Sequence, residues 1–63
     1  MSLKEEREKR GFSQSELAKR SGVNVRLIQD YEQGHKNINR AAVETVLDLS
    51  EALDVSIYKI INR

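Results

Sequence analysis

The chain contains no cysteine, no proline and no tryptophan, and only three of its 63 residues are glycine. Without cysteine it can form neither a disulfide bond nor a thiolate metal site. No apolar run approaches the roughly 18 residues of a transmembrane helix, and no apolar core of a signal peptide is present. These absences lead us to expect a cytoplasmic protein that contacts no membrane.

Few side chains in the sequence are suited to catalysis or to metal binding. His35 is the only histidine, and no second ligand stands at a usable spacing from it, so we interpret it as a loop residue. Glu5, Glu6 and Glu8 lie close together, but a small solvated helix has no cleft in which they could act. No glycine-rich phosphate loop is present. We therefore expect no enzymatic activity, no cofactor and no bound metal.

Length and charge limit the architecture. A chain of 63 residues with 38% hydrophobic content is long enough for one small core, so we expect a single domain over residues 1–63. Residues 1–40 carry nine Lys/Arg and six Asp/Glu, whereas residues 41–63 carry two and four. The positive N-terminal part favours a polyanionic partner, although a solvated surface of mixed charge would show the same balance.

Start and stop signals divide the chain into five predicted helices. Each glycine follows a helix-forming run, where a residue in the left-handed conformation is favoured. Residues suited to N-caps precede the runs, and Glu5 and Glu16 complete capping boxes. These N-cap candidates are Ser2, Ser13, Asn24, either Asn37 or Asn39, and Ser56. The predicted helices span about residues 3–10, 14–20, 25–33, 40–53 and 57–62.

Apolar residues recur at helical spacing and predict which sides turn inward. The expected core residues are Leu3, Phe12, Leu17, Ala18, Val23, Leu27, Ile28, Tyr31, Val43, Val46, Leu47, Leu49 and Leu53. At about 100° per residue, positions 25, 26, 29, 30 and 33 fall on the side of their helix opposite Ile28 and Tyr31. That side is predicted to face solvent or a partner.

The second and third predicted helices are joined by a glycine-containing turn, SGVN, which is typical of a helix-turn-helix unit. A helix that stands out from such a unit fits the major groove of DNA. Geometry alone also fits a corner between two helices in any small bundle. The spacing therefore favours DNA binding without deciding it.

The stretch LKEEREKRGFSQSELAKRSGVNVRLIQDYEQG resembles the Cro/repressor-type, XRE-like helix-turn-helix family. The shared features are the Arg of the first helix, SQ-x-E-LA, SGV in the turn and I-x-x-YE-x-G. LDLSEALDVS resembles the family's fourth helix and its exit. The resemblance implies an all-α, compact five-helix lambda-repressor-like DNA-binding domain, with its helix-turn-helix unit at about residues 14–33. It implies sequence-specific binding of double-stranded DNA by a bacterial or phage transcriptional regulator, repressor-like and associated with the nucleoid.

The resemblance also implies roles for individual residues. Arg7 and Glu32 would form a largely buried ion pair between the first helix and the end of the third. The base-reading positions would be Val25, Arg26 and Asp30. Contacts to phosphates, or positioning beside them, would come from Ser13, Gln14, Asn24, Lys36, Asn37 and Arg40. By chemistry, Arg26 suits guanine O6/N7, Val25 a thymine methyl group and Asp30 a cytosine amine.

Three features depart from the family pattern. The stretch HKNINR is a few residues longer than the commonest family form and lacks its usual proline. Glu6 stands where many members have an apolar residue. Asp30 brings negative charge toward the groove, and an ion pair with Arg26 would draw Arg26 away from the bases.

The C-terminal segment VSIYKIINR carries more apolar residues than such a short helix can bury within its own domain. We therefore expect a homodimer through Ile57, Tyr58, Ile60 and Ile61, matched to a near-palindromic operator whose half-sites lie about 34 Å apart. Alternatively, the isoleucines cover the core near Leu3. A second class of function is also open, a protein-interaction module on the same scaffold, such as an antitoxin-like or adaptor protein.

Overall fold

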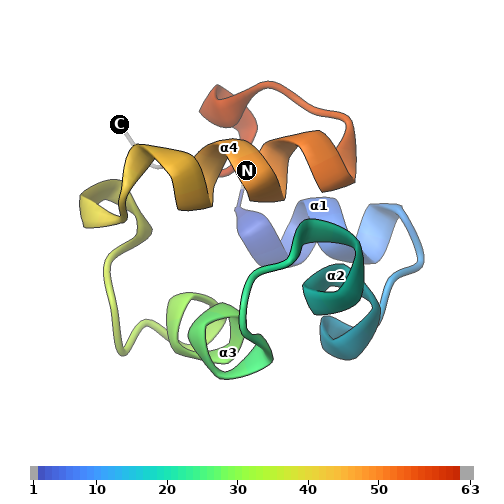
Figure 1. Ribbon diagram of the computed structural model, residues 1–63, viewed down its shortest axis with the longest axis horizontal. Coiled ribbons are helices and arrows are strands. Elements are labelled where there is room, and N and C mark those ends of the chain that lie inside the picture. The colour runs from blue at the N-terminus through green and yellow to red at the C-terminus, as the bar shows by residue number, and fades with distance from the viewer. Residues whose placement is uncertain (1, 62–63) are drawn as a thin grey trace.

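The computed structural model describes residues 2–61, which form four α-helices and two short 3-10 turns. In chain order these are α1 (Leu3–Lys9), α2 (Gln14–Ser21), α3 (Val25–Gln33), the turn η1 (Ile38–Arg40), α4 (Val43–Leu53) and the turn η2 (Ile57–Lys59). No strand occurs in this described part, so the all-helical fold class is confirmed (Figure 1). None of the helices in residues 2–61 has the length and hydropathy that crossing a membrane requires.

The fifth predicted helix, over residues 57–62, is not confirmed. Its described residues form only the single 3-10 turn η2, with Ser56 as its N-cap, and residue 62 lies outside the described residues. Ser56 Oγ accepts from the N–H of Tyr58 at 3.2 Å. The cap predicted from the sequence is thus correct, but the element that follows it is much shorter.

Side-chain caps determine where α1 and α2 begin. Ser2 Oγ accepts a hydrogen bond from the N–H of Glu5 at 3.1 Å, and Ser13 Oγ accepts from the N–H of Glu16 at 3.0 Å. These bonds satisfy backbone donors that have no acceptor within the helix. Both predicted helix starts are confirmed.

The predicted start of the fourth helix is wrong. Asn37 Oδ1 accepts from the N–H of Asn39 at 2.9 Å and so caps η1, not α4. The helix α4 begins at Val43, and Ala42 before it provides no side-chain cap. An asparagine side chain that bonds two residues ahead stabilises a local turn in place of a helix, which explains the difference.

The helices α2 and α3 end at glycines in the left-handed conformation, as predicted from the sequence. Gly22 ends α2 at φ 75°, and Gly34 ends α3 at φ 81°, a conformation that glycine adopts without a Cβ clash. The helix α4 ends instead at Asp54, with φ 56°. Aspartate is one of the few other residues that tolerate this conformation.

The core draws on every helix. Residues without any exposed surface are Leu17, Ile28, Leu49, Leu53 and Ile60, and Leu3, Val23, Ile38 and Val46 are also buried. The helix α2 packs against both α3 and α4, and α1 packs against α3. This packing leaves α3 and α4 on opposite sides of the molecule (Figure 1).

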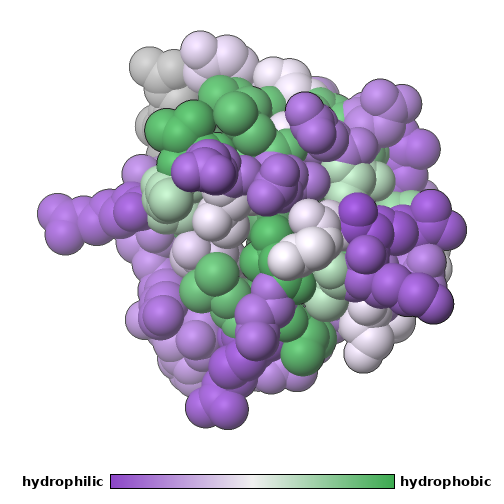
Figure 2. Space-filling view, viewed as in Figure 1, coloured by the Kyte–Doolittle hydropathy of each residue, from purple (hydrophilic) through white to green (hydrophobic). Residues whose placement is uncertain are grey.

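Two of the expected core residues are not in the core. Val43 is 73% exposed and Leu47 is 43% exposed. The buried stripe of α4 runs through Val46, Leu49 and Leu53, and positions 43 and 47 lie on the neighbouring stripe at about 100° per residue. Together with the half-buried Ile57 and Ile61 they line a shallow apolar hollow. We call these four residues the C-terminal apolar patch, and Figure 2 shows apolar surface over η2, in the upper part of that view.

The structure corrects one residue of the predicted dimer contact. Ile60 has no exposed surface and belongs to the core of its own chain, so it is not available to a second copy. Ile57 and Ile61 are half-buried against the same core, whereas Tyr58 is 57% exposed. Part of this segment therefore covers the core, as in the alternative interpretation.

Candidate nucleic-acid interface

The helix α3 is supported by the core on one side and open on the other. Ile28 is fully buried, and Leu27 and Tyr31 are half-buried against the core cluster. On the opposite side, positions 25, 26, 29, 30 and 33 are half-buried or exposed, and none is buried. Arg26 is the most open charged group there, with 81% of its side chain exposed.

Asn24 marks the start of α3. Its Oδ1 atom accepts from the N–H of Arg26 at 2.7 Å, which satisfies a backbone donor of the first turn. Asn24 and the half-buried Val25 also line an open hollow between α2 and α3. The cap thus orients the first turn of α3, from which Val25 and Arg26 extend.

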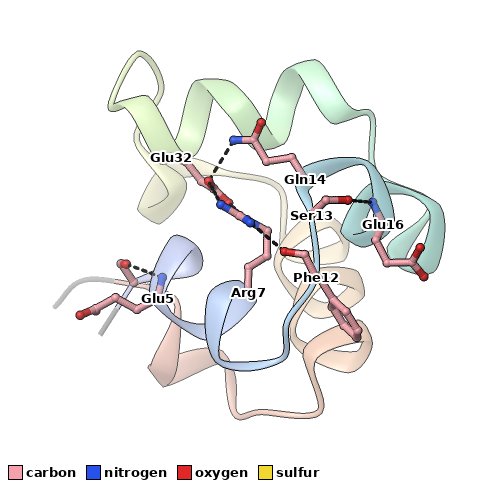
Figure 3. A network of polar contacts seen from close by, with 8 residues as sticks. Glu5, Arg7, Phe12, Ser13, Gln14, Glu16 and Glu32 are labelled. Atoms are coloured by element: carbon pink, nitrogen blue, oxygen red, sulfur yellow. Dashed lines mark hydrogen bonds and ion pairs between the residues drawn. The ribbon is translucent and has the colours of Figure 1, made fainter.

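A buried ion pair joins α1 to the end of α3. Arg7 Nε lies 2.7 Å from Glu32 Oε2, and Arg7 Nη2 donates to Glu32 Oε1 at 2.9 Å (Figure 3). Only 11% of the Arg7 side chain and 2% of the Glu32 side chain are exposed. The hydrogen bond to Glu32 raises the pKa of Arg7 above its ordinary value, against the opposing effect of desolvation. The guanidinium is therefore charged at every physiological pH.

Two further hydrogen bonds extend this network to the start of α2. Arg7 Nη1 donates to the carbonyl oxygen of Phe12 at 2.8 Å, and Gln14 Nε2 donates to Glu32 Oε1 at 3.0 Å. The network spans α1, the loop before α2 and the end of α3. It fixes the N-terminus of α2 relative to α3.

Gln14 and Ser13 therefore have structural bonds of their own. The amide nitrogen of Gln14 points to Glu32, and its amide oxygen points away from Glu32 (Figure 3). Ser13 Oγ is engaged by the N–H of Glu16. The first N–H groups of a helix have no acceptor within the helix and form the positive end of its dipole, so this terminus can receive an anion.

Comparison with known proteins identifies the family of this arrangement. Residues 3–60 match the model of a protein family described as "Helix-turn-helix". The chain belongs to the XRE-type helix-turn-helix family. Members of this family are DNA-binding regulators and in general are not enzymes.

A relative of this helix-turn-helix chain is named "Putative HTH-type transcriptional regulatory protein" and comes from Pyrococcus abyssi. The two are 42% identical over 60 residues, which cover 95% of this chain and 18% of the relative. The helix-turn-helix chain thus spans less than a fifth of the length of that protein. No solved structure matches it.

The loop that follows the helix-turn-helix carries the remaining predicted contacts. Lys36, Asn37 and Arg40 are exposed, and neither Lys36 nor Arg40 forms an ion pair within residues 2–61. Asn37 uses its Oδ1 atom to cap η1. The two cations and the Asn37 amide nitrogen are available to an anionic partner beside α3.

His35 lies in the loop after α3, as predicted, but its contact with Asp30 was not predicted. Its Nδ1 atom lies 3.7 Å from Asp30 Oδ1, and the same oxygen lies 3.9 Å from Arg26 Nε. The signal was present in the sequence, because Gly34 ends α3 and folds the next residue back toward Asp30. Periodicity on α3 alone does not include a residue beyond the glycine.

Proposed function

We propose that this protein binds double-stranded DNA sequence-specifically, places α3 in the major groove, and acts as a repressor-like transcriptional regulator at the nucleoid. The observation that carries the proposal is the open side of α3, supported from behind by Ile28. A helix with its side chains is about 10–12 Å wide, and the major groove is about 12 Å wide.

The base-reading positions would be Val25, Arg26 and Asp30. Arg26 would donate to guanine O6 and N7, and Val25 would contact a thymine methyl group. Asp30 Oδ1 is shared between two neighbours, so a cytosine amine would donate to the other carboxylate oxygen. The exposure of Arg26 supports the first assignment most strongly.

Phosphate contacts would flank these positions on both sides. The N-terminus of α2, with Ser13 and Gln14, would receive one phosphate through backbone N–H groups and the remaining amide group of Gln14. Asn24 would contribute at the start of α3. On the other side, Lys36, Asn37 and Arg40 would contact the DNA backbone. Neither Lys36 nor Arg40 has an ion-pair partner within residues 2–61, which supports this role.

We further propose that two copies associate through the C-terminal apolar patch and Tyr58. An isologous contact of this kind would place two recognition helices on one near-palindromic operator, with half-sites about 34 Å apart. The exposure of Val43 and Leu47 supports the proposal, because large exposed apolar groups mark interaction surfaces.

The experiment that tests the function is selection of bound sequences from a random DNA pool, followed by binding measurements on the selected duplex. Arg26→Ala should weaken binding to that duplex by about 1–3 kcal/mol and relax the preference at one base pair. Lys36→Ala is the matched control, and it should weaken binding equally on every sequence. Uniform weakening by Arg26→Ala would show that Arg26 holds only a phosphate.

The salt dependence of the DNA-binding constant distinguishes this function from that of a protein-interaction module on the same scaffold. A dimer with about six phosphate contacts should give a log–log slope near −5. Absence of binding to any duplex at low salt would reject the DNA-binding proposal. The apolar patch would then be the main surface for a protein partner.

A further inference from the structure

Three side chains meet beside the last turn of α3. Asp30 Oδ1 lies 3.9 Å from Arg26 Nε and 3.7 Å from His35 Nδ1. Arg26 and His35 are 81% and 66% exposed, whereas Asp30 is only 19% exposed. One shielded carboxylate oxygen therefore faces two exposed groups. The guanidinium is always charged, and the imidazole is charged only when it is protonated.

The backbone holds His35 in this place. Gly34 reverses the chain at the end of α3, and the N–H groups of His35 and Lys36 both donate to the carbonyl oxygen of Asp30, at 2.9 and 3.2 Å. Arg26 lies one helical turn before Asp30. The imidazole is thus held next to Arg26 on the side of α3 that we assign to DNA.

Asp30 is the charged group that faces His35. Within residues 2–61 no other carboxylate lies within ion-pair distance of the imidazole. Lys36 and Arg40 in the same loop, and Lys4 on α1, form no ion pair with Asp30 within the described residues. The positive charge next to Asp30 at this position therefore depends on the protonation of His35.

We propose that His35 is a protonation-dependent DNA contact beside α3. When His35 takes a proton from solvent, it pairs with Asp30 and adds a positive charge beside the phosphates. Phosphate charge favours the protonated imidazole, so DNA binding takes up a proton and tightens as the pH falls. This inference rests on the proposed DNA-binding function.

The test measures the binding of random-sequence duplex DNA at low, constant salt by the full chain and two variants. Between pH 8 and pH 6 the dissociation constant of the unaltered protein should fall about fivefold, because the protonated imidazole adds a positive charge beside the phosphates. His35→Gln should change by less than about twofold over this range. His35→Arg, which is always charged, should bind at both pH values as tightly as the unaltered protein does at pH 6.

Proton uptake gives a second readout that a merely structural role would not change. Calorimetry in two buffers of different ionisation enthalpy should show proton uptake on DNA binding by the unaltered protein, absent in His35→Gln. A flat pH profile in the unaltered protein, or an equal slope in His35→Gln, would overturn the inference while leaving DNA binding intact. Failure of every variant to bind at either pH would overturn the proposed function as well.

Discussion

The outer side of α3 and the C-terminal apolar patch are both exposed, yet their chemistry differs. The α3 side presents Arg26, with Lys36 in the adjoining loop, whereas the patch presents Val43 and Leu47. The charge along the chain follows the same division, because the excess of Lys/Arg lies in residues 1–40. One small core thus carries one side suited to a polyanion and another suited to an apolar protein surface.

The two surfaces also differ in what holds them in place. The orientation of α3 depends on a polar network around Arg7 and Glu32 as well as on Ile28. The patch is backed by apolar packing of α4 and Ile60. Substitutions that break one kind of support should therefore affect stability differently from those that alter either surface.

The largest effect is expected at the buried ion pair. Arg7→Ala should lower the free energy of unfolding by about 3–5 kcal/mol, because it leaves the Glu32 carboxylate buried without its partner. The double variant Arg7→Met with Glu32→Leu should lose much less, since no buried charge remains. Urea denaturation followed by circular dichroism measures both. A loss below about 1 kcal/mol for Arg7→Ala would show that the pair does not support α3.

The next largest effect on stability is expected in the core, and a comparison of two variants distinguishes the core from the C-terminal apolar patch. Ile60→Ala should lower the free energy of unfolding by about 2–5 kcal/mol, because it leaves a cavity in the core. Val43→Ala removes an exposed side chain and should change it by less than about 0.5 kcal/mol. Equal losses for the two variants would contradict the distinction between core and patch.

A third variant tests the patch as a contact surface. Leu47→Glu should weaken self-association at least tenfold, about 1.4 kcal/mol, because it places a charge in an apolar contact. Glu51→Gln, an exposed change on the same helix, is the control. Sedimentation at several concentrations measures the association constant. Identical self-association in Leu47→Glu and the control would place the dimer contact elsewhere.

The smallest effect is expected at Asp54, the residue that ends α4. Asp54→Ala should lower the free energy of unfolding by about 1 kcal/mol, because alanine is strained at the positive φ with which α4 ends. Asp54→Asn should be nearly neutral, because asparagine tolerates this conformation. The ion pair of Asp54 with Arg10 is exposed and contributes little. Thermal denaturation distinguishes the two variants, and equal melting temperatures would count against strain at this position.

Local signals in the sequence were sufficient for most of the fold. Ser2, Ser13 and Asn24 act as caps through side-chain bonds to their own neighbours, which spacing alone can predict. Gly22 and Gly34 end helices for a reason equally local, the left-handed φ. The resemblance to the family is confirmed, and with it the XRE-type assignment.

The errors concern features that depend on tertiary packing. Val43 and Leu47 fit the helical period, but the stripe that α4 buries is set by where α2 packs, and these residues fall beside it. Glu6 is 5% exposed although charged, with Lys9 Nζ at 3.3 Å from its carboxylate. Ile60 is buried because the chain turns back after α4 and packs η2 against that helix, which brings Ile60 into the core. None of these outcomes can be obtained from periodicity in one helix.

The candidate site was predictable only in its outline. The outward positions of α3 follow from the helical wheel, and none of them is buried. The link from Asp30 to His35 crosses the end of the helix and depends on the backbone turn at Gly34. The DNA contacts assigned to the residues of this site are proposals, and the binding experiments described above test them.

The most direct test of the central claim is a nuclear magnetic resonance titration of the isotope-labelled protein with a short duplex. Amide and side-chain signals should change at Val25, Arg26 and Asp30, and at the start of α2. The signals of Val43 and Leu47 in the patch should remain unchanged at constant association state. Changes confined to the patch, with α3 unaffected, would contradict the claim that the open side of α3 contacts DNA.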